Sequence, residues 1–137
     1  MNPSLTHMLM VHHNIYNTWT WTGGHADGQS DLLQIAIKEA KEETGLAVVT
    51  PYCPDILSLD ILPVYGHMKN GHYVSAHLHL SAAFLLIADT DKPLAVCLGE
   101  NSAVRWVPWD KVPGYSNEPF MITIYQKMLQ RIGHEKN

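Results

Sequence analysis

The sequence predicts a single α/β domain in which a mixed sheet lies between two helices. Its 137 residues are 46% apolar and 16% charged, a composition that supports a folded core and excludes disorder. Apolar stretches bounded by turn residues indicate strands, and Asn-Gly at residues 70–71 indicates a hairpin. Two segments with helical periodicity, one in the first half and one at the end, supply a helix for each face of the sheet. We therefore expect an α/β/α sandwich.

Six segments are expected to form strands, because their apolar and β-branched residues are bounded by turn residues. In chain order they are Leu5–Val11, the aromatic segment Thr18–Thr22, the strand start Ala47–Thr50, Ile56–Val64, Tyr73–Ile87 and Val104–Val107. The turn Lys69-Asn70-Gly71 joins the two longest of these strands, since Asn-Gly is a strong hairpin signal.

Two helices are expected, and residues that favour helix ends bound the first of them. Ser30 is a good N-cap, because its hydroxyl can accept from the free N–H groups of the first turn. Gly45 can adopt the left-handed conformation that closes a helix, so this helix should cover Asp31–Thr44. The second helix is expected at Glu118–Ile132, with Pro119 in its first turn.

Three glutamates gather at the end of the first helix. At 100° per residue, Glu39, Glu42 and Glu43 fall within about a 100° arc. Their repulsion, at the negative end of the helix dipole, costs stability unless a cation neutralises it. Mg²⁺ or Mn²⁺ prefers such oxygen ligands, whereas the interleaved Lys38 and Lys41 are also compatible with an ordinary solvated surface. The carboxylates alone leave both interpretations open.

The complete spacing of residues 24–46 resembles a known motif. Written as G-x5-S-x7-K-E-A-x-E-E-x-G-L, it is similar to the Nudix box, G-x5-E-x7-R-E-U-x-E-E-x-G-U, where U is aliphatic. Ser30 stands where the family has its first glutamate, and Lys38 replaces the family's arginine. The many fixed positions that do match, from Gly24 to Leu46, predict that residues 1–137 form a single Nudix domain.

The resemblance implies a metal-dependent hydrolase. In Nudix enzymes the box glutamates bind divalent cations that hold the substrate diphosphate, so Glu42 and Glu43 are expected metal ligands for Mg²⁺ or Mn²⁺. Glu39 is expected as a ligand or as the base for the attacking water. Glu100 precedes a strand tryptophan, as a loop glutamate does in many Nudix enzymes, and is either an extra ligand or base or an exposed loop carboxylate. Lys38 can supply the charge of the family's arginine but not its bidentate fork.

Further residues are candidates for binding the substrate. Gly24 and His25 lie where the backbone of Nudix folds meets the metal-bound phosphates. Trp19 and Trp21 alternate on the segment that enters the box and can stack on a planar group, although tryptophans are also ordinary core residues.

Two histidines among the nine in the chain are also candidates. His77 and His79 are two residues apart on a predicted strand and therefore point to the same face. Two imidazoles so placed could bind zinc, but no third ligand is positioned to complete a zinc site. We expect these histidines to line the substrate cleft or to pack in the sheet.

The implied reaction is hydrolysis of the diphosphate linkage in a nucleoside diphosphate linked to another group. No short signature after the box identifies that group. The alternative is a catalytically weakened Nudix-like ligand-binding or interaction module, which the departures at Ser30 and Lys38 suggest. Retention of the three box glutamates favours the enzyme.

Charge and composition restrict the partners and the location. A net charge of −4 with no basic stripe argues against dedicated nucleic-acid binding. The sequence shows no transmembrane run and no signal pattern at its start, so no membrane association is expected. Cys53 and Cys97 lie in apolar contexts without metal-ligand spacing, which indicates reduced thiols and a cytoplasmic protein.

One departure from the family concerns the first strand. Nudix domains usually place a full strand before the one expected at Leu5–Val11, and only 23 residues precede Gly24. We therefore expect that strand to be absent and the domain to be N-terminally truncated. A partner chain could cover the sheet edge left unpaired, so a homodimer is expected.

Overall fold

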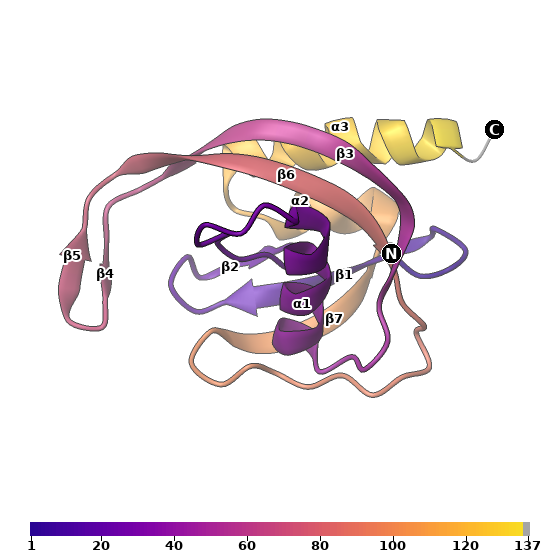
Figure 1. The fold of residues 1–137 in the computed structure, drawn as a ribbon, viewed down its shortest axis with the longest axis horizontal. Coiled ribbons are helices and arrows are strands. Elements are labelled where there is room, and N and C mark those ends of the chain that lie inside the picture. Colours follow the sequence, from indigo (N-terminus) through magenta and orange to yellow (C-terminus); the bar gives the residue numbers. More distant parts are fainter. Residues whose placement is uncertain (136–137) are drawn as a thin grey trace.

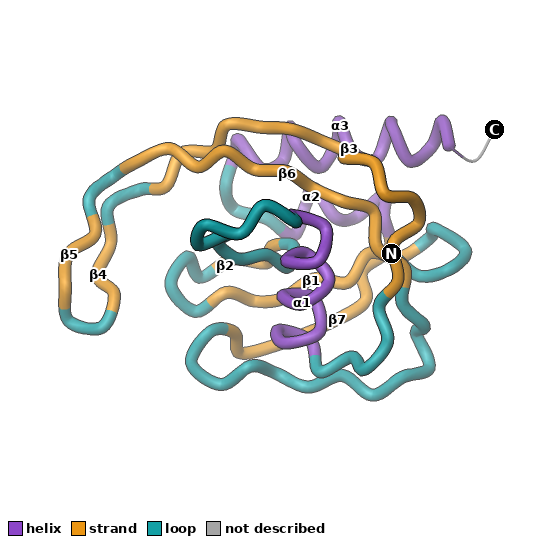
Figure 2. Tube along the Cα trace, in the orientation of Figure 1, coloured by secondary structure: helices purple, strands orange, loops and turns teal. Residues whose placement is uncertain are grey.

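The computed structural model describes residues 1–135 and confirms the α/β class (Figures 1 and 2). The strands are β1 (His7–His13), β2 (Thr18–Thr20), β3 (Thr50–Val64), β4 (His67–Lys69), β5 (His72–Val74), β6 (His77–Ile87) and β7 (Asn101–Pro108). The helices are α1 (Leu32–Thr44), α2 (Val112–Tyr115), which follows a 3-10 turn at Trp109–Lys111, and α3 (Pro119–Glu135). Both α1 and α3 contact β3. Within the described residues, no helix is both long and apolar enough to cross a membrane.

Within residues 1–135 the strands pair in three small antiparallel sheets, which corrects the expectation of one mixed sheet. β1 lies between β2 and β7, β3 pairs with β6, and β4 pairs with β5. β3 contains Pro51, Pro54 and Pro63, which have no N–H to donate to a neighbouring strand, and its pairing with β6 is irregular between Pro51 and Ser58. β3 and β6 form a long ribbon, which arches above α1 in Figure 1.

The chain enters β1 through a tight turn. Leu5 has a positive φ of 54°, so the strand begins at His7 and not at Leu5. The side chain of Asn2 closes this turn, since its Oδ1 accepts from the N–H of Thr6 at 2.8 Å and of His7 at 3.0 Å. As expected, the described residues contain no strand before β1, although the backbone of Met1 hydrogen-bonds to the end of β6.

α1 ends where the sequence predicts and begins one residue later. Its N-cap is Asp31, not Ser30, because the Asp31 carboxylate accepts from the N–H of Gln34 at 3.1 Å. A carboxylate there satisfies a first-turn donor and also suits the positive end of the helix dipole. Gly45 has a φ of 73° and its N–H donates to the Lys41 carbonyl at 2.9 Å, which confirms the left-handed C-cap.

The other elements follow the prediction with changed limits. β3 is continuous where the sequence predicts two strands, and the strand expected at Tyr73–Ile87 is divided into β5 and β6. The predicted hairpin turn is confirmed between β4 and β5: Asn70 and Gly71 have φ values of 51° and 78°, as a two-residue turn with both residues left-handed requires. The last helix starts at Pro119, one residue later than expected, and continues to Glu135, beyond the expected end at Ile132.

The largest core cluster lies between β1, β7 and α3. Met10 of β1, Val107 of β7 and Tyr125 of α3 are fully buried within it. Tyr125 also reaches the segment that leads toward α1: its hydroxyl accepts from the N–H of Trp21 at 3.1 Å and donates to Oγ1 of Thr20 at 3.3 Å. The core thus fixes the start of the loop that passes the three glutamates.

Candidate active site

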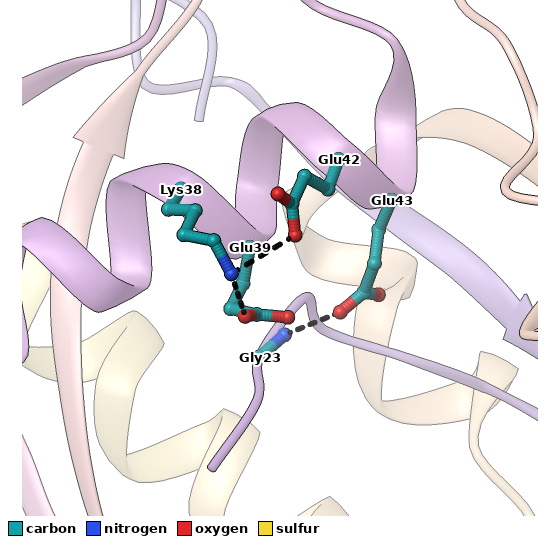
Figure 3. A network of polar contacts seen from close by, with 5 residues as sticks. All are labelled: Gly23, Lys38, Glu39, Glu42 and Glu43. Atoms are coloured by element: carbon teal, nitrogen blue, oxygen red, sulfur yellow. Dashed lines mark hydrogen bonds and ion pairs between the residues drawn. The ribbon is translucent and has the colours of Figure 1, made fainter. Parts of the chain in front are cut away.

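The last two turns of α1 carry the three glutamates, beside the loop that precedes the helix (Figure 3). Their exposure differs: Glu43 is buried, the side chain of Glu39 is 17% exposed and that of Glu42 is 55% exposed. Gly23 and Gly24 in the preceding loop contact the two less exposed carboxylates. These three glutamates, called the acidic group below, therefore extend from the protein interior to the surface.

Glu43 is the most strongly perturbed carboxylate of the group. Its Oε1 accepts from the N–H of Gly23 at 3.0 Å. Burial raises the pKa of Glu43 from 4.5 to about 7, and the negative charges of Glu100 and Glu39 contribute to the increase. Glu43 therefore binds a proton near neutral pH, and a cation that enters the site would displace this proton.

Gly24 lies against Glu39 so closely that a larger residue cannot replace it without displacing the carboxylate. A Cβ added at Gly24 would overlap Cδ and Oε2 of Glu39 and would lie 2.8 Å from its Oε1. The glycine at the start of the box thus allows the backbone to pass directly over the Glu39 side chain.

Lys38 lies between two of the carboxylates. Its Nζ is 3.4 Å from Oε1 of Glu39 and 3.3 Å from Oε2 of Glu42, and the hydrogen bonds to Glu42 and then Glu39 raise the pKa of Lys38. In this arrangement no three carboxylate, imidazole or thiol groups of residues 1–135 are placed to hold a metal ion. The side chain of Lys38 is 62% exposed, so its ammonium can turn into solvent. The oxygen atoms it would leave suit Mg²⁺.

Glu100 approaches this group from the loop between β6 and β7. Its charge acts on Glu43, and its carboxylate hydrogen-bonds the thiol of Cys97 in the same turn. Asn101, which is 3% exposed, connects the turn to α1: its Nδ2 donates to the Glu43 carbonyl at 2.9 Å and its Oδ1 accepts from the N–H of Cys97 at 3.2 Å. Asn101 belongs to no motif in the sequence, so nothing there indicates that it bonds to a residue 58 positions earlier.

Three candidate histidines come together at the loop before α1. Nε2 of His79 is 2.9 Å from Nε2 of His77 and 3.4 Å from Nε2 of His25. Burial lowers the pKa of His79, and the charges of His25 and His77 lower it further. The sequence predicts the pair on β6, but the addition of His25 depends on the path of the loop. His25 directly follows Gly24, whose backbone lies against the carboxylate of Glu39, so one loop connects the histidines to the three glutamates.

The two candidate tryptophans pack against the main core cluster. The ring of Trp19 meets Tyr115 edge-on at 6.0 Å, and the guanidinium of Arg105 lies 5.5 Å from its centre. The ring of Trp21 meets Tyr125 edge-on at 5.8 Å. Both side chains remain partly exposed. A stacking role toward the substrate stays a prediction for both.

The sequence matches a family model described as NUDIX domain, over residues 1–131. No curated protein matches the sequence.

Several solved structures share the fold. An Ap4A hydrolase of C. elegans, in a binary complex, is 17% identical with a TM-score of 0.62, over 93% of this chain and 87% of that chain. A NUDIX-family hydrolase of Clostridium perfringens is 19% identical with a TM-score of 0.61, over 93% and 90%. The MutT protein of Bacillus halodurans is 18% identical with a TM-score of 0.59, over 91% and 75%. At these identities the likeness establishes the fold alone.

Proposed function

This chain belongs to the NUDIX family, and from that premise we propose that it is a pyrophosphohydrolase that hydrolyses the diphosphate linkage of a nucleoside diphosphate joined to another group. The observation that carries the proposal is the set of carboxylates at the end of α1, with a glycine loop directly over them. Such a site can bind cations through the carboxylates and leave room for a phosphate chain beside the glycines.

We propose Mg²⁺ or Mn²⁺ as the cofactor, bound by Glu39, Glu42 and Glu43. The donors are carboxylate oxygens, which hard cations prefer, and Lys38 already bridges two of them as a positive charge. A bound ion would neutralise the diphosphate and acidify a water molecule. Binding should also release a proton from Glu43, whose pKa of about 7 leaves it partly protonated at neutral pH.

The protein's own part in the reaction is to accept a proton and to orient the phosphate chain. The oxygen of a water molecule bonds to one phosphorus, and the bond from that phosphorus to the bridging oxygen breaks. The bridging oxygen leaves with the other phosphate, while the proton of the water passes to Glu39 or Glu100. Gly24 and His25 are proposed to border the phosphates, because Gly24 adjoins the carboxylate of Glu39 and His25 is the next residue in the loop.

A panel of nucleoside diphosphate derivatives with Mg²⁺, scored by chromatography of the nucleotide products, tests the proposal. Ap4A, ADP-ribose and nucleoside triphosphates should be included, because the fold neighbours do not identify a substrate. Glu42→Gln should lower turnover at least about a hundredfold. Asp110→Asn removes an equal charge from an exposed residue and should have no effect. Full activity of the Glu42 variant would refute the metal-ligand assignment.

A separate substitution can identify which glutamate accepts the proton from the attacking water. Glu100→Gln should lower turnover more than about tenfold if Glu100 accepts the proton, and the acidic limb of the pH–rate profile should then change. Unchanged turnover would remove Glu100 from the mechanism and leave Glu39 as the base.

A catalytically weakened binding module is the second candidate. The contacts of Lys38 with Glu39 and Glu42 favour it, because a lysine that remained there would compete with a metal ion for the same oxygens. A module of this kind would bind a nucleotide from the panel and hydrolyse none of them. Lys38→Ala would then restore metal binding in calorimetry, whereas an active enzyme would bind Mg²⁺ without the change.

We also propose that the protein forms a homodimer through the outer face of the β3–β6 ribbon. Leu59, Ile61, Leu78 and Leu80 are each 64–82% exposed, and the register, with Ile61 opposite Leu80, puts them on one face. Uncharged surfaces of this kind often mark protein interfaces. Sedimentation should show a dimer that Leu80→Glu dissociates and that Val48→Glu, at another exposed position, does not. A monomeric wild-type protein would refute the proposal.

The cytoplasm is the proposed location. Cys53 and Cys97 are both free thiols, as expected in a reducing compartment. Fractionation of cells expressing the protein would test this location.

A further inference from the structure

The three histidines beside the acidic group form a cluster that the proposed hydrolysis does not require. His77 and His79 extend from one face of β6, and His25 reaches them from the loop before α1. Nε2 of His79 lies 2.9 Å from Nε2 of His77 and 3.4 Å from Nε2 of His25. Both contacts are short enough for hydrogen bonds between the rings.

The hydrogen bonds define where the protons lie in the neutral cluster. Nδ1 of His77 is 2.8 Å from the carbonyl oxygen of Ser75, and a carbonyl can only accept, so this nitrogen carries a proton. Nε2 of neutral His77 must then accept, and His79 donates its Nε2 proton to it across 2.9 Å. Nε2 of His25 faces the same N–H at 3.4 Å. The Nε2 proton of His79 therefore faces one nitrogen atom of each neighbouring imidazole.

Adding protons changes the cluster from an acceptor into a donor site. A further proton on the pair would make Nε2 of His77 a donor as well, so neither Nε2 atom of the pair could accept from the other, and the charges of the rings would repel. The charged groups that act on His79 are His25 and His77, and no carboxylate is among them. An anion beside the rings would accept from these N–H groups in charge-assisted hydrogen bonds. Anion binding and proton uptake should therefore favour each other.

The position of the cluster indicates which anion it meets. His25 is covalently joined to Gly24, whose backbone lies on the carboxylate of Glu39. A phosphate chain whose diphosphate is held at the carboxylates would reach the imidazoles with its next phosphate. A metal ion is the other usual ligand of converging imidazoles, but the described residues contain no three such groups placed to hold one.

We propose that His25, His77 and His79 form a subsite for a third phosphate, so that the preferred substrates are nucleotides with three or more phosphates in a row. The location of the first two phosphates rests on the proposed function. The anion subsite itself does not, because inorganic polyphosphate can occupy it without being hydrolysed.

Calorimetry in metal-free buffer tests the subsite directly. Inorganic tripolyphosphate should bind about tenfold more tightly at pH 6 than at pH 8, with proton uptake seen as a buffer-dependent enthalpy. His79→Gln should abolish this pH dependence, and His25→Asn should weaken binding as well. His72→Asn, on β5 in the exposed hairpin, should leave it unchanged. Affinity that is equal at both pH values and unaffected by the His79 and His25 variants would overturn the proposal.

Kinetics with Mg²⁺ distinguish this proposal from the proposed function. His79→Gln should raise KM about tenfold for a nucleoside triphosphate, leave its kcat unchanged and leave KM for ADP-ribose, which has two phosphates, unchanged. An equal rise for both substrates would refute a third-phosphate subsite. If the wild-type protein hydrolyses neither substrate, the proposed function fails, and the calorimetry still decides whether the histidines bind the anion.

Discussion

Replacing Glu43 by glutamine should stabilise the metal-free protein at pH 8 and have little effect at pH 4.5. Burial raises the pKa of Glu43 from 4.5 to about 7. The folded protein therefore retains a proton on Glu43 between these pH values, while the unfolded chain loses it. Because the folded state binds more protons in this window, the free energy of unfolding falls as pH rises from about 4.5 to about 7.

The size of this loss follows from the difference of about 2.5 pKa units. At 1.36 kcal/mol per unit, the ionised Glu43 carboxylate costs about 3 kcal/mol of stability above pH 7. Glutamine has a similar shape and its oxygen can still accept from the N–H of Gly23, but it does not ionise. The variant should therefore lack this cost at every pH.

Urea unfolding at pH 4.5 and pH 8, with metal ions removed, measures the effect. With a slope of about 2 kcal/mol per molar urea, the midpoint of Glu43→Gln should exceed that of the wild type by about 1.5 M at pH 8. The two midpoints should nearly coincide at pH 4.5. A variant that is less stable than the wild type by the same amount at both pH values would show that the carboxylate is not desolvated in the folded state.

Three further substitutions test the surroundings of the site. Gly24→Ala should lower turnover at least about tenfold with little change in thermal stability, because its Cβ would displace Glu39; normal turnover would refute this contact. Gly45→Ala should destabilise the protein by about 1–3 kcal/mol in urea, since φ is 73° and the added Cβ would lie 2.7 Å from another methyl group. Asn101→Ala should cost about 1–3 kcal/mol and also lower turnover, because it leaves the Glu43 carbonyl without its donor. Loss of stability without loss of turnover would show that Asn101 does not position the site.

The sequence correctly predicted the helix end and the hairpin turn, because each is set by the conformation of one or two residues. Gly45 ends α1 because its own φ must be positive, and Asn70-Gly71 forms the hairpin turn for the same reason. The N-cap was placed at Ser30 instead of Asp31 because both residues can cap a helix and only the geometry of the first turn decides between them.

Contacts between distant segments account for what the sequence could not indicate. Asn101 hydrogen-bonds a carbonyl 58 residues earlier, and His25 joins a histidine 54 residues later. Spacing within a motif contains no information on either contact. The same holds for the sheets, because β1 pairs with β7 near the other end of the chain, and the sequence alone does not indicate which strands are neighbours.

The hydrogen bonds of Asn101 connect the two parts of the candidate site, which are the end of α1 and the loop before β7. The helix supplies the charges proposed to bind an ion, and the loop from Ala88 to Glu100 supplies a further carboxylate. The loop is also fixed by the N–H of Ala95, which donates to the Thr44 carbonyl at 2.8 Å. Directed evolution could therefore randomise the other residues of this loop while keeping Ala95 in the loop and Asn101 at the start of β7. Chemistry at the loop carboxylate could then change without any substitution in the helix.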